Sequence, residues 1–237
     1  MSAIEVRNVT RSFGGIRAVS SVSFNVEPTE IIGIIGPNGS GKSTLFNVLT
    51  GVHKPGGGRI TLRGRDITGW PPYRIARAGI GRTFQIPAPF TNMTVRENLL
   101  TAAVEGDWKS ASRRAQEILE SLDLGRVADD LADTLSGGQR RLLEFGRVRM
   151  RDPEVILLDE VTAGVNPRLR EIILDAVREL RRRGKTFIVI EHDMELVRTV
   201  CERIMVMDAG EVVAQGTFDE VARNELVIDA YLGGPAE

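Results

Sequence analysis

The chain has 237 residues, of which 42% are hydrophobic and 27% charged, so it has the material for a sizeable core and is not a disordered protein. Its 31 basic and 32 acidic residues give a formal net charge of −1, which argues against a protein that chiefly coats nucleic acid. A single cysteine excludes an internal disulfide framework. No segment approaches the roughly 18 apolar residues of a membrane span, and the first residues lack the apolar core of a signal peptide. We therefore expect a cytoplasmic chain.

The first part of the sequence predicts short strands separated by glycine-rich turns. Residues Ile4–Val9 and Val19–Val26 indicate an antiparallel pair of strands, separated by the turn-rich segment Ser12–Gly15. The nearly continuous apolar run Glu30–Ile35 is typical of a strand buried on both faces, and Lys42–Thr50 has the pattern of a helix. Further elements are predicted in this part: a strand at Arg59–Leu62, a short helix from Pro71-Pro72, and a strand at Ile80–Phe84.

The middle of the sequence has a different character. Between Val95 and Arg151 there is little strand signal, and Ser110–Leu122 has helical spacing. After this region strands and helices alternate again, with strands at Val155–Leu158, Thr186–Ile190, Ile204–Met207 and Glu211–Gln215, and helices at Arg168–Arg183, Met194–Val200 and Asp219–Arg223. We expect an α/β fold with an inserted helical subdomain.

A phosphate-binding pattern lies between the buried strand and the helix that follows it. Residues 36–43 match G-x-x-x-x-G-K-[ST] in the strand-to-helix context that this pattern requires. Glycines allow backbone N–H groups to converge on phosphates, and the start of the helix adds its dipole. Lys42 can reach the β- and γ-phosphates and Ser43 can ligate magnesium. The alternative is a glycine-rich turn without a ligand. The predicted nucleotide-binding residues are Gly36, Asn38, Gly39, Ser40, Gly41, Lys42, Ser43 and Thr44.

Two carboxylates follow the second buried strand. Asp159 and Glu160 stand after the apolar run Val155–Leu158, at the edge where ligands bind in open α/β sheets. An aspartate at this position can hold magnesium, and a neighbouring carboxylate can orient or deprotonate an attacking water molecule. Alone, the pair could equally be a surface feature of a strand end. Together with the lysine-containing loop, it indicates a phosphoryl-transfer site.

A second loop with two glycines opens a predicted helix over Gln139–Met150. Its residues are Leu135, Ser136, Gly137, Gly138 and Gln139. A helix start of this kind is another anion site, and a chain with two such sites but only one lysine loop suggests a head-to-tail dimer. Taken with the lysine loop, the Asp159-Glu160 pair and His192, this sequence resembles the ATP-binding-cassette ATPase family over essentially its whole length.

The resemblance implies a P-loop fold with a mixed central sheet, an N-terminal antiparallel β-subdomain and an inserted α-helical subdomain. The chain would be one domain, 1–237, with a nucleotide-binding core of residues 1–85 and 153–237 and a helical subdomain of residues 86–152. The implied cofactors are ATP and Mg²⁺, and the implied magnesium ligands are Ser43, Gln85 and Asp159.

Roles for single residues also follow from the resemblance. Phe13 stands where an aromatic residue stacks on adenine, Gln85 where a glutamine contacts magnesium and water, and His192 where a histidine touches the γ-phosphate. Glu160 matches the general base, and Ser136 with Gly137, Gly138 and Gln139 matches the loop that acts across the dimer. Without the resemblance, Phe13 would be a packing aromatic, and Gln85 and His192 would be ordinary polar residues.

Two positions depart from the family pattern. Val161 replaces the proline that usually follows the glutamate, and Asn166 lies where an aspartate is frequent, so hydrogen bonding is kept and the charge is not. With these two changes, the resemblance does not decide how the two cassettes of a dimer communicate. Of the remaining reactive side chains, we expect His53 to be solvated and Cys201 to be a buried structural thiol.

The resemblance also implies partners. A cassette without a membrane span would meet separate permease subunits on the inner face of the cell membrane, in a groove beside the glutamine whose apolar stretch here is Gln85–Phe90. Alternatively, this proline-rich stretch packs on its own helical subdomain. The other implied partners are a second cassette, identical or homologous, and indirectly a solute-binding protein, whereas no nucleic acid is expected.

The runs 79–85, 90–99, 162–167 and 230–233 look like the branched-chain amino-acid type of importer cassette. That subfamily includes transporters for urea and short amides. Typical members carry a longer segment after Asn98-Leu99 than Val104–Ser110 here, so the resemblance does not decide between these solutes. Cassettes that act on DNA or ribosomes are an alternative, but they carry a long coiled coil or a second cassette. A small-molecule kinase, a third reading, would not need the loop at Ser136.

Overall fold

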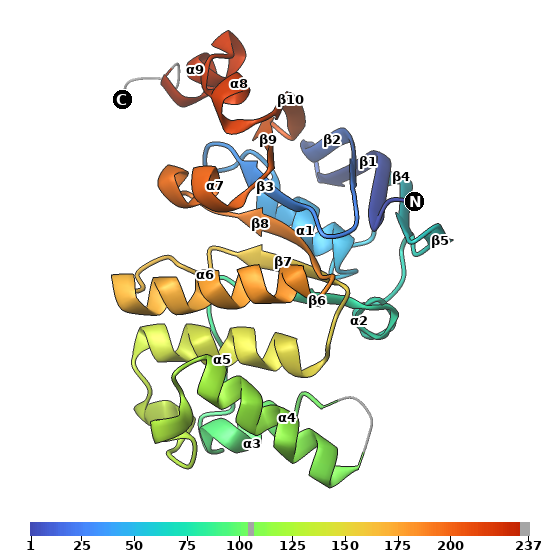
Figure 1. Ribbon diagram of the computed structural model, residues 1–237. Coiled ribbons are helices and arrows are strands. Elements are labelled where there is room, and N and C mark those ends of the chain that lie inside the picture. Colours follow the sequence, from blue (N-terminus) through green and yellow to red (C-terminus); the bar gives the residue numbers. More distant parts are fainter. Residues whose placement is uncertain (104–106, 233–237) are drawn as a thin grey trace.

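The computed structural model describes residues 1–103 and 107–232, and it contains two sheets (Figure 1). The first is antiparallel, with strand order β2-β1-β4-β5. Its strands are β1 (Ile4–Phe13), β2 (Ile16–Val26), β4 (Gly57–Leu62) and β5 (Arg65–Asp66). The expected N-terminal pair is therefore present, and it is longer than predicted because both strands continue to a tight turn at Gly14-Gly15.

The second sheet has the order β10-β9-β3-β8-β7-β6. Its strands are β3 (Ile31–Ile35), β6 (Ile80–Arg82), β7 (Val155–Asp159), β8 (Thr186–Ile190), β9 (Arg203–Asp208) and β10 (Glu211–Gly216). All neighbours in it are parallel except β9 and β10, which form an antiparallel hairpin. The sheet is thus mixed, and the predicted α/β fold is confirmed.

The helices are α1 (Lys42–Leu49), α2 (Pro72–Ala78), α3 (Val95–Leu100), α4 (Trp108–Ser121), α5 (Gly137–Met150), α6 (Pro167–Arg182), α7 (Met194–Val200), α8 (Phe218–Ala222) and α9 (Glu225–Leu232). Two short 3₁₀ helices lie at Gly125–Val127 and Ala132–Thr134. Helix α9 lies in a segment whose pattern predicts only a tail, and strand β6 ends two residues before the predicted Phe84.

Side chains of the central strands alternate between two apolar cores. In β3, Ile32 and Ile34 pack with Leu45 and Phe46 of α1 and with the antiparallel sheet, whereas Ile31 belongs to the core on the helical side. The side chains of β7 and β8 are distributed between the two cores in the same way. Because both faces are covered, these strands read as continuous apolar runs rather than as alternating ones.

Helices α3, α4 and α5 gather on the side of α6 that faces away from the sheet (Figure 1). They supply apolar residues to the helical-side core, among them Leu99, Leu119 and Phe145. The parallel strands β3, β7 and β8 all end at one edge of the sheet, which brings the residues after each strand together. Within the described residues, we find no helix long and apolar enough to cross a membrane.

Candidate functional site

The loop after β3 is packed too closely for most side chains. A Cβ atom on Gly36 would lie 2.0 Å from the carbonyl oxygen of Met207, and one on Gly41 would lie 2.2 Å from that of Ala18. Gly41 also has a φ of +100°, in the region that favours glycine. The loop therefore follows β2 and β9 closely, and its path into α1 depends on these glycines.

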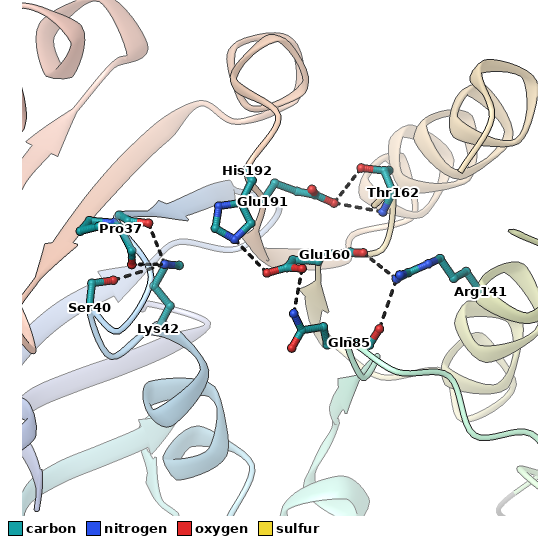
Figure 2. Close-up of polar contacts among 10 residues, drawn as sticks. Pro37, Ser40, Lys42, Gln85, Arg141, Glu160, Thr162, Glu191 and His192 are labelled. Atoms are coloured by element: carbon teal, nitrogen blue, oxygen red, sulfur yellow. Dashed lines mark hydrogen bonds and ion pairs between the residues drawn. The ribbon is translucent and has the colours of Figure 1, made fainter. Parts of the chain in front are cut away.

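Lys42 is the first residue of α1, and its ammonium group turns back onto the loop. Nζ donates hydrogen bonds to the carbonyl oxygens of Gly36 (2.7 Å) and Pro37 (2.9 Å) and to Ser40 Oγ (3.3 Å), as Figure 2 shows. Burial lowers the pKa of the Lys42 ammonium, and the carboxylates at the end of β7 oppose that shift. Lys42 is thus a buried cation close to those carboxylates.

Ser40 of this loop is also buried, whereas four other predicted residues are more open to solvent. Helix α1 begins at the glycine Gly41 without a side-chain cap, so its first N–H groups remain available to an anion. Asn38, Gly39 and Ser43 are exposed, and Thr44 is half-buried. The geometry is that of a phosphate-binding loop.

Asp159 ends β7 and is only 2% exposed. Its Oδ2 accepts a hydrogen bond from Arg82 Nη2 at 2.8 Å, forming an ion pair whose two side chains are 3% and 8% exposed. Arg82 also donates to Asn47 Oδ1 (2.6 Å) and Thr50 Oγ1 (3.3 Å) of the α1 segment. Arg82 thereby joins β7 to α1. We did not anticipate this role, because the sequence places Arg82 in a strand far from both partners.

Three predicted residues meet at Glu160, immediately after β7. Glu160 Oε2 accepts a hydrogen bond from Gln85 Nε2 at 3.0 Å, and Oε1 lies 2.9 Å from His192 Nε2. Figure 2 shows this group between the Lys42 loop and Arg141. The Glu160 side chain is 17% exposed and that of His192 is 49% exposed, so the group is open to solvent on one side.

The backbone at Glu160 is held in an uncommon conformation. Its φ is +48°, in the left-handed region that non-glycine residues adopt uncommonly. Arg141 of α5 donates from Nη1 to the carbonyl oxygens of Glu160 (2.8 Å) and Gln85 (3.3 Å). Arg141 therefore ties two of the predicted catalytic residues together, and no sequence signal pointed to it.

A buried carboxyl lies behind this group. Glu191 is 3% exposed, and its Oε1 accepts hydrogen bonds from the backbone N–H (3.1 Å) and the hydroxyl (2.9 Å) of Thr162. Burial raises the pKa of the Glu191 carboxyl, the hydrogen bonds from Thr162 oppose the shift, and the charges of Glu160 and Asp193 add to it. Glu191 holds the turn after Glu160 against the end of β8.

The segment that departs from the family pattern is well ordered by local contacts. Asn166 caps α6, because its Oδ1 accepts a hydrogen bond from Leu169 N at 3.0 Å. Val161 is 5% exposed and belongs to the helical-side core. Packing of Val161 and the cap by Asn166 thus hold this segment between the sheet and α6.

Phe13 lies at the end of β1 and is 41% exposed. Its ring makes an edge contact with His53, with centroids 5.1 Å apart, and the guanidinium of Arg11 lies 4.5 Å from its centroid. The prediction that His53 is simply solvated is therefore wrong: the ring is half-buried because it packs on Phe13. Periodicity could not reveal this contact, since it joins the first strand to the turn after α1.

Ser136 caps α5 instead of contacting the lysine loop. Its Oγ accepts a hydrogen bond from Gln139 N (3.3 Å), and Gln139 Oε1 accepts one from Ser136 N (2.9 Å). A Cβ atom on Gly138 would lie 2.6 Å from Leu169 Cδ1, whereas Gly137 has open space around it. Among the residues that the structure describes, no hydrogen bond or ion pair joins this loop to Lys42 or Glu160.

The stretch after Gln85 is apolar and exposed, as expected. Ile86 is 81% exposed and Phe90 is 46% exposed, and Phe84, just before Gln85, is 53% exposed. Its backbone is nevertheless anchored to α5, since Glu144 accepts hydrogen bonds from Phe84 N (2.7 Å) and Ala88 N (3.2 Å). Beside it lies a groove of about 470 Å³, lined among others by Ile75 of α2 and by Phe84.

The donor set suits a magnesium ion bound together with phosphates. Asp159 Oδ1 is buried and has no hydrogen-bond partner in the described part of the chain. No group of three or more His, Cys, Asp or Glu side chains that could hold a metal was found among the described residues. Magnesium is commonly held by one or two carboxylates plus substrate phosphates, so this sparse set fits it.

These features define an ATP-binding cassette, and solved structures agree. The chain superimposes on a nucleotide-free ATP-binding cassette from an ABC transporter with a TM-score of 0.90 and 36% identity, over 99% of this chain and 100% of that one. A second cassette of an ABC transporter, in its ADP conformation, matches with a TM-score of 0.89 and 37% identity over 99% and 100%.

Sequence comparisons show to which family the chain belongs. Residues 19–163 match the model described as "ABC transporter", and residues 211–237 match "Branched-chain amino acid ATP-binding cassette transporter". The chain is 39% identical to a probable branched-chain amino acid transport ATP-binding protein, LivG, of Archaeoglobus fulgidus, over 98% of this chain and 96% of that protein. It is 42% identical to the high-affinity LivG of Salmonella typhimurium, over 97% of both. The chain belongs to the ABC transporter family and is one of its ATPases.

Proposed function

We propose that this chain is the ATP-hydrolysing subunit of an importer for branched-chain amino acids. The observation that carries the catalytic part is the meeting of Gln85, Glu160 and His192 beside the Lys42 loop. The choice of solute depends on the relatives, which are transport proteins for branched-chain amino acids and are about 40% identical over nearly the whole chain.

ATP binds on the loop that precedes α1. Lys42 gives up its contacts with the loop carbonyl groups and donates to the β- and γ-phosphates, while the first N–H groups of α1 donate to the phosphate oxygens. The predicted contacts of Gly36, Asn38, Gly39, Ser40, Gly41 and Thr44 belong to this cradle. We assign Phe13, which is 41% exposed at the end of β1, to the adenine.

Glu160 acts as the general base. Its carboxylate accepts the proton of the attacking water, and Gln85 and His192 hold the carboxylate and contact the water and the γ-phosphate. Ser43, Gln85 and Asp159 would hold magnesium, which neutralises charge on the phosphates when bound. Arg82 holds the Asp159 carboxylate through one oxygen and leaves the other free for this purpose.

The active unit is a dimer of cassettes. Among the described residues, no hydrogen bond or ion pair joins Ser136 and its neighbours to the lysine loop of their own chain. Ser136 and Gly137 are exposed at the start of α5, and Gly138 and Gln139 are half-buried. We assign Ser136, Gly137, Gly138 and Gln139 to the γ-phosphate held by a second cassette, identical or homologous. Bound nucleotide then closes the dimer, and loss of the γ-phosphate opens it.

Membrane permease subunits dock in the groove beside Gln85–Phe90. The exposed side chains of Phe84 and Ile86 and the 470 Å³ groove support this assignment. Because Arg141 and Glu144 fasten this stretch to α5, a movement of residues 86–152 relative to the core (1–85 and 153–237) carries the docked permease with it. The chain is thereby peripheral at the inner face of the membrane, and a solute-binding protein contributes only through the permease.

Two variants test the catalytic assignment. Glu160→Gln should bind ATP and accumulate as a closed dimer in size-exclusion chromatography, with steady-state phosphate release reduced by at least about 100-fold because the base is lost. Lys42→Ala should lose ATP affinity, measured by a fluorescent nucleotide. Normal turnover by Glu160→Gln, or normal ATP binding by Lys42→Ala, contradicts the corresponding role.

A pull-down from native membranes tests the partners. Tagged chain is incubated with ATP and magnesium, and the co-purifying proteins are identified. Recovery of a polytopic permease, whose reconstituted complex takes up leucine in an ATP-dependent manner, supports the importer. Recovery of ribosomal or DNA-bound factors instead contradicts transport while leaving the ATPase activity intact.

A further inference from the structure

A polar pocket of about 580 Å³ lies away from the nucleotide site, where α4, α5 and α6 meet. In Figure 1, α5 lies between α4 and α6. The lining residues come from α4 and from the C-terminal ends of α5 and α6 with the residues that follow them. Its volume is within the range of small-molecule sites, roughly 300–1,000 Å³. None of the residues assigned above to ATP, magnesium or the permease lines it.

The pocket carries an excess of positive charge. Five cationic side chains line it, namely Arg113, Arg114, Arg149, Arg183 and Lys185, against three acidic ones, namely Glu117, Asp152 and Glu179. Two of the cations, Arg114 and Lys185, share a single carboxylate, that of Asp152, at 3.1 Å and 2.9 Å. Arg183 pairs with Glu179. The pocket therefore has two more cations than acids, which is the charge that a phosphate dianion would balance.

Arg149 is the most informative residue of this pocket. The residue is only 7% exposed, and its one side-chain hydrogen bond goes from Nη1 to the neutral Ser121 Oγ at 2.8 Å. No carboxylate of the described residues forms an ion pair with it. Burial lowers the pKa of its guanidinium, the charges of Arg183 and Arg114 add to that shift, and the charge of Glu179 opposes it. A buried charge without an ionic partner is costly, so a cation kept in this position indicates a missing anion.

The capping of helix ends explains why some of these cationic side chains lie in the pocket. Arg114 Nη2 donates to the carbonyl oxygen of Arg149 (2.8 Å), and Lys185 Nζ donates to that of Asp152 (3.3 Å), at the C-terminal end of α5 where cations are favourable. Arg149 also lies in the last turn of α5, where its charge is favourable, but its guanidinium donates to Ser121 and caps no carbonyl group of the described residues. Capping also leaves out Arg113, an exposed residue of α4 that lines the pocket.

We propose that this pocket binds a phosphate group, either inorganic phosphate or the phosphate of a small phosphomonoester. A guanidinium offers paired donors that match phosphate oxygens, and Arg149 supplies such a group from inside the fold. Arg113 and Arg183 approach from α4 and α6. Because the ligand would contact all three helices, its binding would hold α4 and α5 against α6.

Calorimetric titration of inorganic phosphate into the full chain tests the proposal. The Lys42→Ala background weakens phosphate binding at the nucleotide loop, because the cation of that site is lost. In this background we expect phosphate to bind, and Arg149→Met to weaken binding by about tenfold or more, as expected for loss of a charged hydrogen-bond donor. Arg126→Ser, which removes an exposed arginine outside the pocket, is the matched control and should bind as its parent does.

A second variant guards against a folding defect. Arg113→Ser changes an exposed side chain and should weaken phosphate binding by about threefold or more through its charge. Absence of binding in the Lys42→Ala chain, or equal affinity in Arg149→Met, Arg113→Ser and their parent, would overturn the proposal. Titration with adenosine monophosphate distinguishes the ligand's source: tighter binding than phosphate indicates a nucleotide, and equal or weaker binding indicates free phosphate. Neither outcome affects the ATPase assignment.

Discussion

The ion pair between Arg82 and Asp159 predicts a large loss of stability when only one partner is removed. In Arg82→Met, the Asp159 carboxylate stays in a position that is 3% exposed and loses the guanidinium with which it is paired. Asn47 and Thr50 lose their donor as well. Breaking a buried pair in this way costs about 3–5 kcal/mol. For a chain of this size, that corresponds to a fall in melting temperature of roughly 6–20 °C.

A double-mutant cycle separates the charge from the packing. Asp159→Asn removes the stranded charge, so the double variant Arg82→Met/Asp159→Asn should be more stable than Arg82→Met alone. The measurement is the free energy of unfolding in urea, without nucleotide or magnesium, for the four chains of the cycle. If Arg82→Met costs less than about 1 kcal/mol and the two changes are additive, the buried ion pair is not what joins β7 to α1.

Three further predictions follow from single sites. Gly36→Ala should lower the free energy of unfolding by at least about 1–3 kcal/mol in urea, because its Cβ would lie 2.0 Å from the Met207 carbonyl oxygen, while Gly15→Ala, in open space, should have little effect. Since burial raises the pKa of Glu191, ionisation destabilises the fold as pH rises above 4.5, so the stability advantage of Glu191→Gln should grow between pH 4 and pH 8; a constant difference would contradict this. Cys201 is half-buried rather than fully buried as predicted, yet the apolar surroundings of its thiol raise the pKa to about 12. A thiol reagent at pH 8 should therefore react roughly a thousandfold more slowly with the folded chain than with the urea-unfolded one, and equal rates would refute this shielding of the thiol.

The predicted function depended on segments in which neighbouring residues act together. The loop Gly36–Ser43 and the pair Asp159-Glu160 could be found because each is contiguous and adjoins a buried strand. Continuous apolar runs predicted the central strands correctly, since both faces of the sheet are covered. The end of β6 was misjudged, because the chain leaves the sheet at Phe84, where Glu144 of a distant helix takes its N–H group.

The sequence by itself therefore determined the class of fold, the family and the chemistry of the nucleotide loop. Only the tertiary structure decided which side chains support that chemistry. Arg82 meets Asp159 across 77 residues of sequence, and the guanidinium of Arg141 reaches Glu160 across 19. The pocket around Arg149 likewise combines three helices. Such contacts depend on how elements pack, and a pattern within one element carries no information about its partners.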